Sequence, residues 1–338
     1  MKRREFITLI GGAAATQVIR PGSAPAATSA KRAIIGMPLI GGPYISDAGE
    51  IGQSFVNAFV QGLQDLGYAL DHDVDLRIRL GGGDVDGYPA FIEKEIVPLK
   101  PDIIYASATM DAVAARKATS AIPIVSAALA NPVRLGLIAS EARPGGNVTG
   151  IMPYVAGLPA KQIELAREMV PGATVVGLLT NSIDPKGAPQ VPELEAAGHA
   201  VGLKSVAVDV DRQKDIEAAI RELANKRPDV MIVLETSLLV VSSPQIAAAA
   251  LAMRLPTVCG YREHVVAGAL ISYGVDLRWC FGRSASFVDK ILRGAAPGDL
   301  PIEFPTKFPL TINLRTAKEL GISVPHSLLS RADEVIEG

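Results

Sequence analysis

Polar side chains of types that bind small zwitterions follow several apolar runs in the second half of the chain. Glu235 is suited to a ligand ammonium group and Arg262 to a carboxylate, because hydrogen bonds between charged groups are the strong ones. Tyrosine rings near them can pack against an apolar or aromatic ligand body. The candidate binding residues of this half are Tyr154, Asn181, Glu235, Thr236, Tyr261, Arg262 and Tyr273. The alternative for Arg262 is an ion pair with Glu263 or another surface carboxylate, and the alternative for Tyr273 is packing between domains.

The first half offers small residues and hydroxyl groups at the comparable positions. The segment 38–46 contains Gly41-Gly42 and the ring of Tyr44, and such a loop can present backbone N–H groups and an aromatic face to a ligand. Ser107 and Thr109 follow one apolar run and Ala128 follows the next, where free N–H groups at a helix start can hold a carboxylate. Each of these positions has an ordinary connecting loop as its alternative.

Signatures of catalysis and of metal binding are largely missing. The sequence has no G-x-S-x-G nucleophile elbow, no Walker phosphate loop and no H-E-x-x-H, and its four histidines lack metal-ligand spacing. One enzymatic alternative stays open, because two-domain α/β racemases use one thiol from each domain and the chain has Cys259 and Cys280. These cysteines are alternatively a disulfide in an oxidising compartment or two separate buried thiols. We therefore expect a binding protein with no metal and no cofactor.

The elements that must position these groups alternate between short β-branched runs and longer amphipathic stretches, a pattern typical of parallel sheets covered by helices. The predicted strands are 33–40, 74–80, 103–107, 122–127, 174–180, 203–208, 230–234 and 257–260, with a further short strand before Ser272. The first predicted helix begins near residue 50. The other predicted helices cover 88–99, 110–119, 159–170, 190–197, 213–225, 245–253 and 276–292. The sequence thus predicts an α/β fold made of two successive βαβα series, divided near the turn cluster 144–147. Ligands of such sheets bind beyond the carboxyl ends of the strands, where the candidate residues lie.

Residues 1–27 have the features of an export signal. Lys2-Arg3-Arg4 precedes a short apolar run, and small residues at 24–27 offer a cleavage site. The adjacent arginines favour the twin-arginine route, with an ordinary secretory signal as the alternative. No second apolar stretch is long enough to span a membrane and no cysteine follows to accept a lipid, so we expect a soluble periplasmic protein. The formal net charge of −2, without a basic stripe, argues against nucleic acid and anionic membranes as partners.

A series of motifs resembles one known family. They are Arg143-Pro144-Gly145-Gly146-Asn147-Val148-Thr149-Gly150, Ser272-Tyr273-Gly274, Lys290-Ile291-Leu292-Arg293-Gly294, Asp299-Leu300-Pro301, Pro305-Thr306-Lys307-Phe308 and Ile312-Asn313-Leu314. On these motifs the chain resembles the substrate-binding proteins of ABC transporters, in the tryptophan/tyrosine-type branch with a type I periplasmic-binding-protein fold. The resemblance covers nearly the whole chain after the signal. It departs at Asn131-Pro132-Val133, where the family has D-P-V, and in the segment 81–87.

This resemblance implies two Rossmann-like lobes, each with a parallel β-sheet flanked by helices, joined by a three-crossing hinge near 150–153, 272–275 and 303–310. Lobe one would hold 31–151 plus 276–303, and lobe two 152–273 plus 304–338. The implied function is to capture a small molecule, an amino acid or related small carboxylate, between the lobes and deliver it to the permease of an ABC transporter in the inner membrane. We expect a monomer. A receptor for a membrane sensor or chemoreceptor and the two-thiol racemase remain as alternatives.

Overall fold

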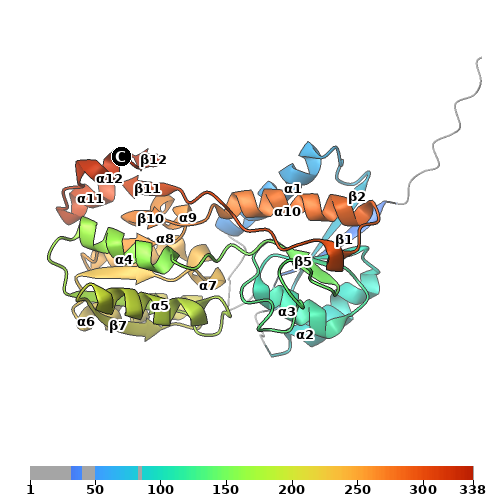
Figure 1. Ribbon diagram of the computed structural model, residues 1–338, viewed down its shortest axis with the longest axis horizontal. Coiled ribbons are helices and arrows are strands. Elements are labelled where there is room, and N and C mark those ends of the chain that lie inside the picture. The colour runs from blue at the N-terminus through green and yellow to red at the C-terminus, as the bar shows by residue number, and fades with distance from the viewer. Residues whose placement is uncertain (1–31, 40–49, 83–85, 338) are drawn as a thin grey trace, which may run out of the picture. The chain divides into compact units, whose positions relative to one another are not determined.

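The computed structural model describes residues 32–39, 50–82 and 86–337, which are arranged around two β-sheets with helices on their faces (Figure 1). The predicted export signal, the glycines Gly41-Gly42 and the candidate residue Tyr44 lie outside the described residues. Within the described ranges, no helix is long and apolar enough to cross a membrane.

The first sheet has five strands in the order β2-β1-β3-β4-β5, and every neighbouring pair is parallel. The strands are β1 (Ala33–Leu39), β2 (Val74–Leu80), β3 (Ile103–Ala106), β4 (Ile124–Ser126) and β5 (Val148–Gly150). All four residues of β3 are buried, and alternate residues belong to two different apolar clusters, Tyr105 to one and Ile104 to the other. Helices therefore cover both faces of this sheet, which explains why its central strands are continuous apolar runs.

The second sheet has seven strands in the order β12-β11-β10-β9-β8-β6-β7. They are β6 (Val175–Thr180), β7 (Lys204–Asp209), β8 (Val230–Val233), β9 (Thr257–Cys259), β10 (Ile271–Tyr273), β11 (Leu310–Asn313) and β12 (Glu334–Ile336). The strand β11 pairs antiparallel with β10, so this sheet is mixed, whereas the sequence predicted a parallel one. The strands β11 and β12 are only four and three residues long, and the sequence pattern did not predict them.

The helices and short turns connect these strands as the α/β class requires. Those of the first sheet are α1 (Glu50–Asp65), α2 (Tyr88–Phe91), α3 (Thr109–Ala118) and α10 (Leu277–Leu292). Those of the second are α4 (Leu158–Met169), α5 (Gly187–Ala200), α6 (Ile216–Asn225), α7 (Ser237–Val241), α8 (Ser243–Ala252), α9 (Arg262–Val266), α11 (Leu314–Leu320) and α12 (His326–Leu329). The predicted α/β fold is thereby confirmed.

The predicted helix at 88–99 is instead three short pieces. The α-helical turn α2 is followed by a π-helical turn at Ile92–Ile96 and a 3-10 turn at Val97–Leu99. Pro98 has no backbone N–H, so it cannot continue the hydrogen bonds of an α-helix, and the chain leaves that geometry before it.

Helix α10 packs against α1, although more than two hundred residues separate them in the chain (Figure 1). The two helices approach closely at Gly62, where an added Cβ would lie 2.3 Å from the carbonyl oxygen of Gly282. Chain segments that leave the first sheet also lie side by side, because Met152 N donates to Glu303 O at 2.9 Å and Glu303 N donates to Gly150 O at 3.0 Å. The chain thus passes between the two sheets along neighbouring paths.

Both cysteines are buried free thiols, which excludes the disulfide alternative. Cys259 belongs to the apolar core of the second sheet and Cys280 to the core between α1, α10 and the first sheet. Burial raises the pKa of Cys280 to about 12, against the opposing charge of Lys186, and raises the pKa of Cys259 further above its ordinary value. Neither thiol has the lowered pKa that a thiolate catalyst needs.

Candidate ligand-binding site

Three predicted residues end neighbouring strands of the second sheet at the same level. Leu179 of β6 pairs with Val233 of β8, and Val233 pairs with Cys259 of β9. Asn181, Glu235 and Tyr261 each come two residues later, and all three are buried. The parallel register therefore places an amide, a carboxylate and a phenol together at the carboxyl edge, where α/β sheets bind ligands.

The backbone of Glu235 is held by hydrogen bonds to both its N–H and its C=O group. Its side chain, in contrast, keeps an unused hydrogen-bond acceptor. Gln190 of α5 accepts a hydrogen bond from Glu235 N at 2.8 Å and donates one to Glu235 O at 3.1 Å. Gln162 of α4 donates to Oε1 at 3.1 Å, whereas Oε2 is buried and has no hydrogen-bond partner among the described residues. Gly260 packs directly against this carboxylate, since an added Cβ would lie 2.2 Å from Glu235 Cγ. Burial raises the pKa of Glu235 to about 7, against the opposing effects of Lys186, Gln162 and Tyr261.

Lys186, which the sequence analysis missed, completes this group. Its ammonium Nζ donates to Tyr261 Oη at 2.8 Å and lies 5.5 Å from the centre of that ring. The residue is only 5% exposed, and burial lowers its pKa while Asp184 and Glu235 favour its charged form. The sequence signal for Lys186 is its place in the loop after β6, the same loop that begins with the predicted residue Asn181.

The loop from β6 to α5 has a fixed conformation that determines where Lys186 points. Asp184 accepts hydrogen bonds from Lys186 N at 2.9 Å and from Ser237 N at 2.8 Å. Gly187 has no room for a side chain, since a Cβ would lie 2.5 Å from the carbonyl oxygen of Asn181. The side chain of Asn181 donates to Val210 O at 2.7 Å, and its Oδ1 is buried without a partner among the described residues.

Three of the predicted residues have mainly structural contacts. Thr236 caps α7, because its side-chain oxygen accepts from Leu239 N at 3.4 Å. Tyr154, in the segment after β5, donates its hydroxyl hydrogen to Glu193 of α5. Tyr273 at the end of β10 is half-buried with its ring 6.3 Å from that of Phe308, a contact between two segments that pass from sheet to sheet.

The comparable edge of the first sheet carries Ser107, Thr109 and Ala128. Thr109 Oγ1 donates to Ala128 O at 2.9 Å, which joins the start of α3 to the segment after β4. Ser107 Oγ donates to Asp111 Oδ2 at 2.5 Å, and Tyr88 Oη donates to Oδ1 at 2.8 Å. Burial raises the pKa of Asp111 to about 6, against these hydrogen bonds and those from the backbone. The structure brings these three predicted residues together, but the hydroxyl hydrogens of Ser107 and Thr109 are already used within the protein.

Arg262 requires a correction. Its guanidinium makes a two-pronged ion pair with Glu334 of β12, with Nη2 at 2.6 Å from Oε1. This confirms the alternative of a pair with a carboxylate near the surface and leaves Glu263 facing Arg278 at 3.7 Å. Because Glu334 already occupies the guanidinium, Arg262 is removed from the candidate site and is a residue that holds β12 against α9.

In the part of the chain that the structure describes, no three His, Cys, Asp or Glu side chains form a group that could hold a metal ion. Burial also lowers the pKa of His264 to about 4, so this ring next to Tyr261 is neutral at pH 7. The site is therefore a set of partly satisfied hydrogen-bonding groups around Glu235 and Lys186. The ring of Tyr261 is buried and packs in the same apolar cluster as Val240, Leu277 and Phe281.

Comparison with known proteins gives consistent matches. The family model described as ABC transporter substrate binding protein matches residues 51–336. The Tyrosine-binding protein of Clostridioides difficile (strain R20291) is 29% identical over 262 residues, which are 78% of this chain and 75% of that protein. A structure of the ABC domain in complex with L-Trp from Streptococcus pneumonia has a TM-score of 0.80 at 24% identity, covering 90% of this chain and 100% of the other. A conserved domain protein from Vibrio cholerae O1 biovar El Tor strain N16961 has a TM-score of 0.81 at 25% identity, covering 90% and 99%.

Proposed function

This chain belongs to the family of ABC transporter substrate-binding proteins, and we propose from that premise that its ligand is an amino acid or a related small carboxylate. Members of the family bind a solute and do no chemistry on it, so the chain captures a solute for an ABC importer and is not an enzyme. Its fold is the type I periplasmic-binding-protein fold that the resemblance implied.

The observation that carries the proposed ligand class is the buried carboxylate of Glu235 with one unpartnered oxygen. A buried polar atom without a hydrogen bond costs free energy, so it marks a place where a bound group restores the missing contact. An ammonium group fits this oxygen best, because it supplies both a donor and the opposite charge. The relative that is named a tyrosine-binding protein supports an α-amino acid, and Tyr261 offers an aromatic wall.

We further propose that two lobes hold this ligand between them, lobe one formed by 31–151 plus 276–303 and lobe two by 152–273 plus 304–338. The packing of α10 on α1 supports assigning α10 to lobe one, and the paired segments at Gly150–Met152 and Glu303 support a hinge there. In such a clamp the ligand gains contacts from both lobes only when they close, so binding shifts an open–closed equilibrium.

Substrate-binding proteins of ABC importers work outside the cytoplasm. We propose the periplasm for this chain, reached through the predicted signal at 1–27, and a soluble monomer without a lipid anchor that docks on an inner-membrane permease. The charged and apolar features of the first 27 residues support export.

A thermal-shift screen tests the ligand class. The panel contains the twenty L-amino acids, aromatic and aliphatic carboxylates, nucleosides and sugars, and calorimetry follows each stabilising compound. We expect an amino acid to raise the melting temperature by several degrees, since a ligand at about 100 times its Kd adds about 2.7 kcal/mol to the unfolding free energy. A saturable response to a sugar or nucleoside, with none to amino acids, would reject the proposed class and leave the family assignment intact.

A further inference from the structure

The ammonium group of Lys186 has far fewer partners than a buried charge requires. The residue is 95% buried, yet Tyr261 Oη is the one hydrogen-bond acceptor that the described residues give to Nζ. An ammonium has three N–H donors, so two remain for another partner. Burial of the ammonium costs free energy, and one hydrogen bond to a neutral phenol and the attraction of Asp184 and Glu235 offset that cost only in part, since the pKa of Lys186 is lowered.

The surroundings keep this charge in place. The backbone of Lys186 is fixed on both sides, because its N–H donates to Asp184 and its carbonyl accepts from Gln190 at 2.8 Å. The same Gln190 binds both backbone groups of Glu235, so one side chain sets the relative position of the lysine and the glutamate. The two opposite charges are neighbours that interact electrostatically, and each keeps unused hydrogen-bonding capacity.

We propose that Lys186 binds the carboxylate of the ligand and, paired with Glu235 for the ammonium, restricts the site to zwitterions. This inference rests on the proposed amino-acid function and assigns to Lys186 the role that the sequence had suggested for Arg262. A carboxylate accepts the two free N–H donors of Lys186, and the charge-assisted bonds offset the cost of burying the ammonium. Tyr261 orients the lysine through its hydroxyl group.

A purely structural role for Lys186 makes a different prediction. If the lysine served only to join the loop after β6 to α9 through Tyr261, replacing it would destabilise the protein and would weaken all ligands equally. A buried lysine that binds the ligand instead lowers the free energy of unfolding of the ligand-free protein. Methionine has a similar length and no charge, so Lys186→Met should leave the melting temperature of the ligand-free protein unchanged or higher.

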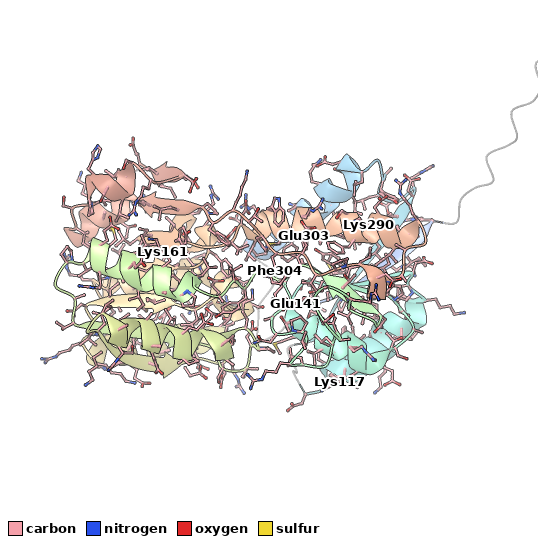
Figure 2. The ribbon with its side chains drawn as sticks, viewed as in Figure 1. Lys117, Glu141, Lys161, Lys290, Glu303 and Phe304 are labelled. Carbon is pink, nitrogen blue, oxygen red and sulfur yellow. The ribbon has the colours of Figure 1, made fainter. Side chains whose placement is uncertain are left out.

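Calorimetry with L-tyrosine and L-tyrosinamide, at a pH where both α-amino groups are protonated, separates these roles, because the amide has a neutral group in place of the carboxylate. The wild-type protein should bind L-tyrosine about 100-fold more tightly than the amide. Lys186→Met should lose about 100-fold in affinity for L-tyrosine and should change little toward the amide. Tyr261→Phe, which keeps the lysine and removes its partner, should show a smaller loss for the acid. Lys161→Met is the matched control, since Lys161 lies on the outside of α4 and pairs with Glu164 (Figure 2).

The outcomes distinguish the inference from the function on which it rests. Equal discrimination between acid and amide in the wild type and in both the Lys186→Met and Lys186→Gln variants would overturn the inference while leaving an amino-acid receptor. If another amino acid gives the stronger thermal shift, that compound and its amide replace tyrosine in the same comparison. A wild-type protein that binds none of the amino acids and none of the carboxylates of the panel would reject the proposed ligand class, and the role of Lys186 with it.

Discussion

Asp111 and Glu235 are two buried carboxylates beside the carboxyl edges of different sheets, and their hydrogen bonds differ. Asp111 beside the first sheet accepts from Tyr88 Oη at 2.8 Å, from Ser107 Oγ at 2.5 Å and from Ala108 N at 3.0 Å. Glu235 at the second sheet accepts one side-chain hydrogen bond, from Gln162, and keeps a buried oxygen without a partner among the described residues.

This contrast indicates which carboxylate is structural and which one binds. A satisfied buried network stabilises and orders the fold, whereas an incomplete one stores free energy that a ligand can recover. Asp111 fixes the start of α3, because its own side chain caps the first turn of that helix. The side chain of Glu235 caps no helix. Both carboxylates are buried, so their hydrogen-bond partners, and not their burial or charge, distinguish the structural residue from the binding one.

The largest expected effect is on ligand affinity at Glu235. Glu235→Gln keeps the shape and the hydrogen bond to Gln162 but removes the charge, so binding of an amino acid by calorimetry should weaken about 100-fold, which is close to 3 kcal/mol. The ligand-free variant should melt at the same or a higher temperature. Asp111→Asn serves as the comparison, and an equal loss of affinity in both variants would remove the distinction between the two carboxylates.

The converse effect concerns stability at Asp111. Asp111→Ala leaves the buried hydroxyl of Tyr88 and the backbone N–H of Ala108 without their acceptor, so the free energy of unfolding should fall by about 2–3 kcal/mol. Chemical denaturation measures this change. The affinity of the remaining folded protein should stay within a few-fold of wild type, and Tyr88→Phe should recover part of the loss in the double variant.

The fold and the candidate site were not equally predictable from the sequence. Strands such as β3 and β8 were found because buried parallel strands are continuous apolar runs, and α10 because its buried residues recur at helical spacing. The edge positions Glu235 and Tyr261 followed from the strand ends. By contrast, the charge balance of the site depends on contacts between distant segments. The bond between Lys186 and Tyr261 spans 75 residues, and no local pattern reveals it.

An effect of intermediate size is expected from pH. Because burial raises the pKa of Glu235 to about 7, the folded protein holds a proton that the unfolded chain has already lost between about pH 4.5 and 7. Stability from this residue is therefore present at low pH and is lost as pH rises through 7. His264 acts in the opposite direction, since its pKa of about 4 makes the folded state bind fewer protons than the unfolded chain below about pH 6.5.

Comparing the pH dependence of stability of the wild type with that of Glu235→Gln isolates the contribution of Glu235, because His264 and Asp111 contribute equally to both proteins. The stability of the variant relative to wild type should rise by about 1–3 kcal/mol between pH 5 and pH 8, measured by denaturation without ligand. Amino-acid affinity of the wild type should increase over the same range, because the ammonium group binds the ionised carboxylate. A constant difference between the two proteins at all pH values would show that Glu235 ionises normally in the fold.

The smallest effect is expected at Arg262, and it sharpens the contrast with Lys186. The sequence suggested the arginine for a carboxylate because it follows β9, but its partner Glu334 lies 72 residues later in a strand that the sequence did not reveal. Both side chains are about one-third exposed, so Arg262→Ala should lower the free energy of unfolding by only about 0.5–1 kcal/mol. Calorimetry should show unchanged affinity for the amino acid and unchanged discrimination against its amide. A large loss of affinity would mean that the guanidinium leaves Glu334 when ligand binds, and it would return the carboxylate-binding role from the buried lysine to the arginine.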